Sequence, residues 1–242
     1  MRRRSIEPGG GFFIAEGAWV VQRALRAGYP LRTVLVEPRW LPTLADVLPA
    51  DSQVFTADVP VLEAVTGYHV HRGALASFSR TPIASVEELA TNAHRLVVLE
   101  QVNNPTNVGA VFRAAAGLGM DGVVLDPTSA DPLYRRAVRV SMGAVLQLPY
   151  ARAEAWPSDL ELLRAAGFRL LALTPAADAV DLRSLAFGDE EKVALLLGAE
   201  GPGLSGEVLA AKDLGVRIPM HHGVDSLNVA AAAAVACYAL AR

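Results

Sequence analysis

The sequence predicts an α/β protein with a mostly parallel sheet and helices on both faces. Three observations predict this fold class. Strand and helix patterns alternate along the 242 residues, and most strands are continuous apolar runs, as in sheets buried on both faces. Several of these runs also lead directly into polar, Gly-containing loops, where α/β folds bind ligands. The C-terminal stretch shows all three features: an apolar run at 216–220, a polar loop at 221–228 and an Ala-rich helix.

Composition sets the broad class of the protein. A hydrophobic content of 52% supports a large core, and 242 residues suffice for one large or two modest domains. The net charge of −3 argues against non-specific coating of nucleic acid, although a local Arg patch remains open. The single Cys237 excludes internal disulfides and multi-Cys zinc sites. With no signal-peptide pattern and no membrane-length apolar run, we expect a cytoplasmic protein that does not associate with membranes.

The N-terminal part, 1–82, is expected to form a small α/β domain. Gly28 is placed to end its first helix and Pro38 to end its second strand. The segment 83–94 is expected to be a linker that carries a short helix to about residue 93, because Ser85 and Glu88 have capping-box spacing. Strands are predicted at 11–15, 31–37, 53–56 and 74–78, and helices at 18–27, 44–48 and 59–66.

The C-terminal part, 95–242, is expected to form a second and larger domain. Its alternating strands and helices indicate a parallel sheet, because parallel strands need a crossover between them. Strands are predicted at 96–99, 122–125, 168–173, 193–197 and 216–220. Helices are predicted at 108–118, 131–140, 160–166, 182–186 and 207–212, and in the Ala-rich segment at the end.

The first polar loop of this part leads into a helix that carries Asn107 and Arg113. Taken alone, Asn107 is best read as a helix N-cap and Arg113 as a solvated side chain. Six residues along a helix leave the two side chains about 120° apart, so joint action requires a ligand that spans the first turns.

The second polar loop, 198–205, follows an apolar strand and contains three Gly and one Pro. Such a loop lets its backbone approach a flat ligand. It lacks the Gly-Lys-Ser/Thr of a phosphate-binding loop and the Gly-x-Gly-x-x-Gly of a dinucleotide site. Glu200 could face a cation or a hydroxyl group, although a solvated carboxylate in a plain turn is the simpler alternative.

The third polar loop holds Asp225, Ser226 and Asn228 just before the Ala-rich helix. Either Ser226 or Asn228 is expected to cap that helix. His221 and His222 are adjacent, so an extended backbone would point them to opposite sides, and we expect no metal site there.

Together, the three loops resemble the ordered motifs of the SpoU-type RNA ribose 2′-O-methyltransferases of the SPOUT superfamily. The first motif is matched by Asn-Val-Gly-Ala-Val-Phe-Arg at 107–113 and the second by Leu-Gly-Ala-Glu-Gly-Pro-Gly-Leu-Ser at 197–205. The third is matched by Ile-Pro-Met at 218–220 and Ser-Leu-Asn-Val at 226–229. Each motif is weak alone, but the ordered trio is specific. The segments 11–17 and 71–78 resemble, less specifically, the ribosomal-protein-like substrate-binding domain of this family.

The resemblance implies a fold, a cofactor and a set of binding residues. The fold is an α/β sheet with a deep C-terminal trefoil knot, preceded by a small RNA substrate-binding domain at 1–82. The cofactor is S-adenosylmethionine, bound within the knot. Carried over, the expected cofactor-binding residues are Thr174, Leu197, Gly198, Glu200, Gly201, Ile218, Met220 and Leu227.

The implied reaction is methyl transfer to a ribose 2′-hydroxyl of RNA. In this family, the residue at the position of Arg113 is proposed to assist deprotonation of that hydroxyl. Since guanidinium groups have pKa values above about 12, phosphate binding and stabilisation of the developing alkoxide is the better role. The expected catalytic residues are Asn107, Arg113, Glu200, Ser226 and Asn228.

The expected partners are RNA and a second copy of the chain. Ribosomal RNA is favoured over tRNA by the additional N-terminal domain, and a patch of Arg135, Arg136 and Arg139 could contact it. The family is usually homodimeric. A tRNA 2′-O-methyltransferase and a non-catalytic RNA-binding member of the fold are the alternatives. A dinucleotide-dependent oxidoreductase lacks its fingerprint after every strand.

Overall fold

The computed structural model describes residues 10–66 and 73–241, so His71 and Arg72 of the N-terminal resemblance lie outside it. Contacts between Cα atoms divide the chain into two compact units. The first unit combines Met1–Pro82 with Pro132–Gln147, and the second combines Ile83–Asp131 with Leu148–Arg242. The sequence places 132–147 in the C-terminal part, whereas in the structure this segment packs with the first unit. None of the described helices is long and apolar enough to cross a membrane.

The first unit is built on a mixed four-stranded sheet in the order β1-β4-β2-β3. Its central strand β4 pairs antiparallel with β1 and β2, and β2 pairs parallel with β3. The helix predicted at 44–48 is wrong, because helical structure begins at Pro38, whose fixed φ suits a first turn, and ends at Leu44. The elements are β1 (Phe12–Glu16), α1 (Ala18–Arg26), β2 (Leu31–Val36), η1 (Pro38–Trp40), α2 (Leu41–Leu44), β3 (Val54–Thr56), α3 (Val59–Thr66), β4 (Ala74–Ser79), α6 (Arg135–Val140) and η2 (Ala144–Leu146).

The second unit is built on a seven-stranded sheet in the order β7-β6-β5-β10-β8-β11-β9. All of its strand pairs are parallel, as the sequence predicts. The carboxyl ends of its strands therefore share one edge. The strands are β5 (Arg95–Leu99), β6 (Gly122–Leu125), β7 (Tyr150–Arg152), β8 (Phe168–Leu173), β9 (Val180–Asp181), β10 (Lys192–Leu197) and β11 (Leu214–Arg217).

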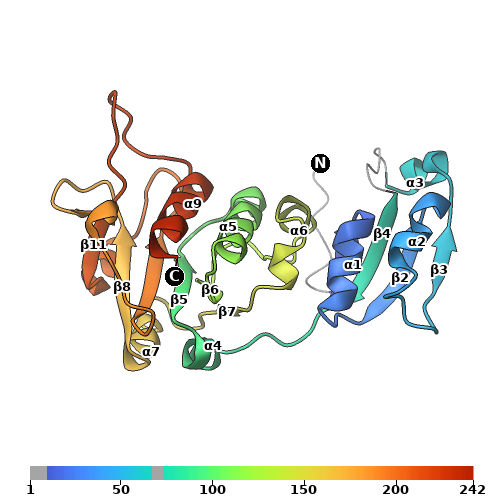
Figure 1. The fold of residues 1–242 in the computed structure, drawn as a ribbon, viewed down its shortest axis with the longest axis horizontal. Helices are drawn as coiled ribbons and strands as arrows, with labels where there is room; N and C mark the ends of the chain where they lie inside the picture. The colour runs from blue at the N-terminus through green and yellow to red at the C-terminus, as the bar shows by residue number, and fades with distance from the viewer. Residues whose placement is uncertain (1–9, 67–72, 242) are drawn as a thin grey trace. The chain divides into compact units, whose positions relative to one another are not determined.

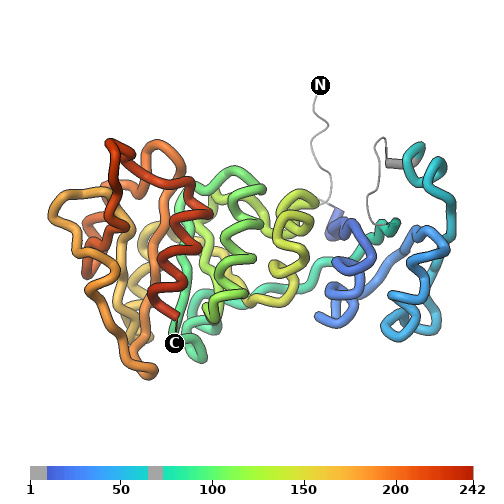
Figure 2. The backbone as a smooth tube through the Cα atoms, turned by 45° about the horizontal axis from the view of Figure 1, so that its top comes forward, coloured from blue at the N-terminus to red at the C-terminus, as the bar shows by residue number. Residues whose placement is uncertain are grey.

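Helices cover both faces of this sheet. On one face α5 (Pro105–Gly117) packs beside α9 (Val229–Leu240), as Figures 1 and 2 show. On the other face α4 (Val86–Asn92), α7 (Leu160–Ala165) and α8 (Gly206–Ala211) pack into one apolar core with the strands. The predicted capping box of α4 is present, with Ser85 Oγ accepting from Glu88 N at 3.1 Å and Glu88 Oε2 accepting from Ser85 N at 2.8 Å. The segment 83–94 therefore belongs to the core of the second unit. A short η3 (Leu182–Ser184) follows β9.

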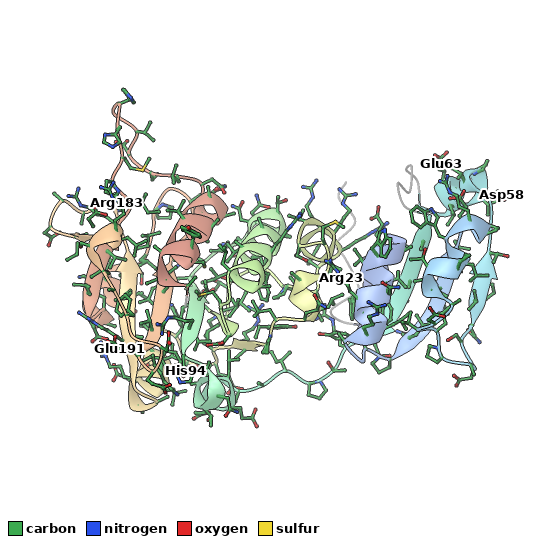
Figure 3. The ribbon with its side chains drawn as sticks, in the orientation of Figure 1. Arg23, Asp58, Glu63, His94, Arg183 and Glu191 are labelled. Atoms are coloured by element: carbon green, nitrogen blue, oxygen red, sulfur yellow. The ribbon has the colours of Figure 1, made fainter. Side chains whose placement is uncertain are left out.

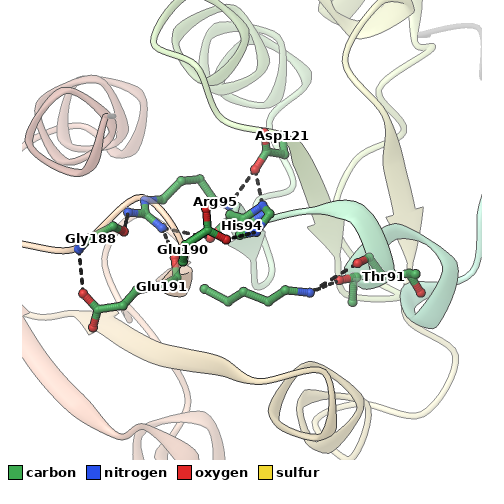
Figure 4. A network of polar contacts seen from close by, with 9 residues as sticks. Thr91, His94, Arg95, Asp121, Gly188, Glu190 and Glu191 are labelled. Carbon is green, nitrogen blue, oxygen red and sulfur yellow. Dashed lines mark hydrogen bonds and ion pairs between the residues drawn. The ribbon is translucent and has the colours of Figure 1, made fainter.

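A buried arginine anchors the end of α9. Arg95, 1% exposed, donates from Nη2 to the carbonyl oxygen of Gly188 at 3.0 Å (Figure 4). Its Nε donates to the carbonyl oxygen of Leu240 at 3.0 Å. Figure 3 shows the neighbouring Glu191 at this amino edge of the sheet and Arg183 at the opposite, carboxyl edge. The contacts of Arg95 satisfy a carbonyl at the helix C-terminus, where a cation is favourable. They hold α9 to the amino edge of the sheet and leave its first turn at the carboxyl edge.

Candidate functional site

A cavity of about 340 Å³ lies at the carboxyl edge of the second sheet. It is bounded by the residues that follow β8, β10 and β11 and by the first turn of α9. This volume lies within the range of about 300–1,000 Å³ that is usual for small-molecule sites. The residues expected from the sequence to bind a cofactor all line it: Thr174, Leu197, Gly198, Glu200, Gly201, Ile218, Met220 and Leu227.

The Gly-rich loop after β10 folds back on itself. Gly203 N donates to the carbonyl oxygen of Ala199 at 3.0 Å, and a Cβ on Gly198 would lie only 2.1 Å from the carbonyl carbon of Gly203. Gly201 and Gly203 have φ values of 93° and 73°, which residues with a side chain rarely adopt. Glycine is therefore required at the neck and the tip of this loop, and the loop presents backbone groups to the cavity.

The chain after β11 forms the opposite wall of the cavity. The strand predicted at 216–220 ends at Arg217, and Ile218 and Met220 belong to a loop instead. Pro219 accounts for this early end, because proline cannot donate a ladder hydrogen bond. Figure 1 shows the following loop, drawn in red, extending away from the sheet before it reaches α9. His221 and His222 are exposed on this loop, and neither lines the cavity.

Asn228 connects the three polar loops. Its Oδ1 accepts from Ala230 N at 3.0 Å and Ala231 N at 3.4 Å, so it caps α9. Its Nδ2 donates to Asn107 Oδ1 at 3.2 Å and also to Glu200 Oε1. The amide thus anchors α9 through its oxygen, and through its nitrogen it joins the first turn of α5 to the Gly-rich loop.

Asn107 has a different position from the one that its sequence context suggests. The interpretation of Asn107 as an N-cap is wrong, because α5 begins at Pro105 and is capped by Asn104, whose Oδ1 accepts from Thr106 N at 2.9 Å. Asn107 therefore lies in the first helical turn, only 7% exposed. Its amide does not cap the helix and is instead the partner of Asn228.

The remaining expected catalytic residues lie at two places. Ser226 lines the cavity, two residues before Asn228. Arg113 is exposed on α5, outside the cavity lining, and makes no hydrogen bond or ion pair with any described residue. An exposed guanidinium of this kind remains available to an anionic group that approaches from solvent.

The expected arginine patch at 135–139 is mostly engaged within the first unit. Glu16, 8% exposed, accepts from Arg135 Nε at 3.3 Å and lies 3.6 Å from Arg139 Nη1. Arg136 is exposed. Two of the three cations therefore hold α6 against β1, which the sequence did not indicate.

Several cavity residues were not expected from sequence reasoning. Leu209 of α8 and Val229 and Ala232 of α9 complete the apolar wall, and Asp225 contributes a carboxylate beside Ser226. The run of Ala in the last helix was the available signal, because small side chains let a helix approach a ligand. Across the described residues, no group of three or more His, Cys, Asp or Glu side chains could hold a metal ion.

Comparison with known proteins identifies the family of this chain. The sequence profile of the SpoU rRNA Methylase family matches residues 94–238. An uncharacterized tRNA/rRNA methyltransferase of Mycobacterium tuberculosis is 46% identical over 98% of this chain and 83% of its own length. The 23S rRNA (guanosine(2553)-2′-O)-methyltransferase of Bacillus subtilis is 28% identical over 94% of this chain and 88% of its own. The AdoMet-bound rRNA methyltransferase of Sinorhizobium meliloti superposes with a TM-score of 0.84 at 27% identity, over 96% of this chain and 88% of its own. The ordered motifs, the parallel sheet and these matches together place the chain in the SpoU rRNA methylase family.

Proposed function

We propose that this chain transfers a methyl group from S-adenosylmethionine to a ribose 2′-hydroxyl of RNA. The observation that carries the proposal is the cluster of Asn107, Glu200 and Asn228, which joins three segments distant in sequence beside a ligand-sized cavity. The AdoMet-bound neighbour supports the cofactor, and the B. subtilis relative supports the 2′-oxygen as the acceptor.

The residues that line the cavity suit the chemical groups of S-adenosylmethionine. Leu197, Ile218 and Leu227 supply apolar surface for a flat purine, while the backbone at Gly198 and Gly201 supplies hydrogen-bonding groups at close range. Thr174, Asp225 and Ser226 add polar side chains that can hold ribose hydroxyls or an amino group. When bound, the cofactor supplies a methyl group already activated on a sulfonium sulfur.

The side chains beside the cavity align the acceptor. Asn228 is fixed by its cap on α9, and it in turn orients the Asn107 amide and the Glu200 carboxylate. Side chains that are held in one conformation favour in-line attack, because they keep the reacting atoms aligned. Arg113 is assigned to the target phosphate and to the negative charge that develops on the 2′-oxygen.

The path of the C-terminal chain belongs to the same proposal. The family resemblance implies a deep trefoil knot in which the segment after β11 threads a loop. The packing of α9 beside α5 and the contact of Asn228 with Glu200 support this path. An experimental structure traced through 198–240 tests the threading directly.

RNA and a second protomer are the proposed partners. The first unit is assigned to RNA binding, and ribosomal RNA is favoured by the name of the matched family and by the B. subtilis relative. Val235 and Tyr238 of α9, 45% and 76% exposed, lie on one helical stripe with Ala231 and offer an apolar surface for a homodimer. An RNA substrate and the single Cys237 fit a cytoplasmic location.

The proposal is tested in two steps. Calorimetry should detect S-adenosylmethionine binding, and NAD should give none, which separates this function from an oxidoreductase. The protein is then incubated with labelled cofactor and with 23S rRNA, 16S rRNA or tRNA in parallel, and 2′-O-methyl nucleosides are identified by mass spectrometry. Label in tRNA alone would select the tRNA alternative. Cofactor binding without label in any RNA would select a non-catalytic RNA-binding member.

A further inference from the structure

Glu100 is a buried carboxylate for which the proposed mechanism has no use. It directly follows β5, is 2% exposed and does not line the cavity. A buried charged group is costly unless its hydrogen bonds are satisfied, so its partners indicate what it does.

The partners of Glu100 lie at both ends of the Gly-rich loop. Its backbone N donates to the carbonyl oxygen of Leu197 at 2.9 Å, immediately before that loop. Its Oε2 accepts from Ser205 N at 2.7 Å, and its Oε1 accepts from Ser205 Oγ at 2.7 Å, at the last residue of the loop. Oε1 also accepts from Trp156 Nε1 at 2.9 Å, which fixes the carboxylate from a third side. One residue therefore ties together the entry and the exit of the segment 198–204.

The Ser205 end of this connection is itself rigid. Ser205 caps α8 by accepting from Val208 N at 3.2 Å, so the carboxylate is linked to the helix as well as to the loop. Between the two ties, the loop carries Gly198, Glu200 and Gly201, which line the cavity. Glu200 in turn accepts the amide of Asn228. A displacement of Ser205 would thus move both the cavity wall and the cluster of Asn107, Glu200 and Asn228.

We propose that Glu100 is a positioning residue that holds the 198–205 loop in its cofactor-binding conformation. The inference rests on S-adenosylmethionine being the ligand of this cavity. Glu100 acts through Ser205 and touches neither the cofactor nor the RNA. Its carboxylate is suited to this role because it accepts from all three neutral donors at once.

The substitution Glu100→Gln tests this role at nearly constant shape. An amide has one accepting oxygen and one donating nitrogen, so it cannot accept from both Ser205 N and Trp156 Nε1. Ser205→Ala removes the hydroxyl from the loop side and tests the same connection should the first variant fail to fold. Asp126→Asn is the matched control. Asp126 directly follows the neighbouring strand β6, and its carboxylate is 1% exposed. It accepts from Gln101 N, Ser129 N and Thr128 Oγ1, and it has no hydrogen bond to the 198–205 loop.

The measurement is the Kd for S-adenosylmethionine by calorimetry, at a temperature well below each variant's Tm. We expect binding about tenfold weaker for Glu100→Gln and for Ser205→Ala, and a double variant no weaker than the poorer single one, because both remove the same connection. Asp126→Asn should lower Tm and leave this Kd within twofold of wild type.

Two results would overturn the inference. The first is wild-type affinity for S-adenosylmethionine in Glu100→Gln or Ser205→Ala. The second is an equal loss of this affinity in Asp126→Asn, which would indicate general destabilisation of the fold. Failure of the wild type itself to bind S-adenosylmethionine would instead refute the proposed function, so the two failures are distinguishable.

Discussion

The side-chain amide of Asn228 donates to Asn107 Oδ1 at 3.2 Å across 121 residues of sequence. The same side chain caps α9 through its oxygen, so the fold and the candidate site share one residue. Its two roles use different atoms, and substitutions can therefore separate them.

Asn228→Ser should retain the helix cap and lose the amide donor. Serine and asparagine are comparable caps, so we expect the free energy of unfolding to stay within about 1 kcal/mol of wild type. Methyl transfer should fall about 100-fold, because Asn107 and Glu200 lose their shared partner. Asn228→Ala should be equally slow and less stable than Asn228→Ser by about 1 kcal/mol. Urea unfolding and single-turnover methylation are the measurements, and normal turnover by Asn228→Ser would contradict the assigned role.

Arg113→Ala should impair catalysis without affecting the cofactor. Arg113 is exposed, so its removal should change the free energy of unfolding by less than about 0.5 kcal/mol. Loss of a phosphate contact should lower kcat/KM for RNA about 100-fold. It should also reduce the slope of log(kcat/KM) against the logarithm of salt concentration by about one unit. Arg169→Ala, at an exposed position on β8, is the matched control and should behave as wild type. Near-normal turnover by Arg113→Ala would refute the assignment.

Gly198→Ala should distort the 198–205 loop at the point where its two ends meet. The added Cβ would lie 2.1 Å from the carbonyl carbon of Gly203 and 2.3 Å from Leu204 N, and neither backbone atom can move alone. We expect a loss of about 1–3 kcal/mol in stability and no detectable cofactor binding. Gly206→Ala is the control, because nothing lies within 4 Å of its Cβ position and helix α8 begins there. It should gain up to about 0.5–1 kcal/mol and bind normally.

Long apolar strands and their loops were predictable because their signals are local. The runs at 122–125 and 168–173 coincide with β6 and β8, since each is apolar apart from Arg169 and is bounded by Gly, Asp or Thr-Pro. The three polar loops could be grouped because the carboxyl ends of parallel strands share one edge. That rule brings Asn107 and Asn228 together without any knowledge of the path between them.

Features that depend on distant contacts were not predictable. Strands β7 and β9 have three and two residues, too few for a periodic pattern, and the neighbouring strands determine them. The placement of 132–147 with the first unit depends partly on the ion pairs of Glu16, which involve α6. The start of α5 was missed because its polar first turn resembles a loop, although Pro105 suits the first helical position.

Asp126 should make stability depend on pH in acid. Burial raises the pKa of its carboxyl, but hydrogen bonds from Ser129, Thr128 and the backbone of Gln101 outweigh burial and leave the pKa below its usual value. Because the folded pKa is lower than the unfolded one, this stabilisation is complete above the unfolded value of about 3.9 and is lost as pH falls through the folded pKa. The free energies of unfolding of wild type and Asp126→Asn, measured with urea, should therefore differ most near pH 7, and the difference should shrink as pH falls below the unfolded pKa. A constant difference across this range would contradict the assignment.

Cys237 should be unreactive in the native protein. It is fully buried in α9, and burial raises the pKa of its thiol to about 12. Since the thiolate is the reactive form, roughly one thiol in 10,000 is ionised at pH 8. We expect no reaction with a chromogenic disulfide reagent under native conditions and one equivalent of thiol released in denaturant, because the chain has one Cys. If S-adenosylmethionine binds only the native state, it should slow the residual reaction by the ratio of total to free protein. Rapid native labelling would show that α9 opens readily, which is incompatible with a fixed Asn228 at its start.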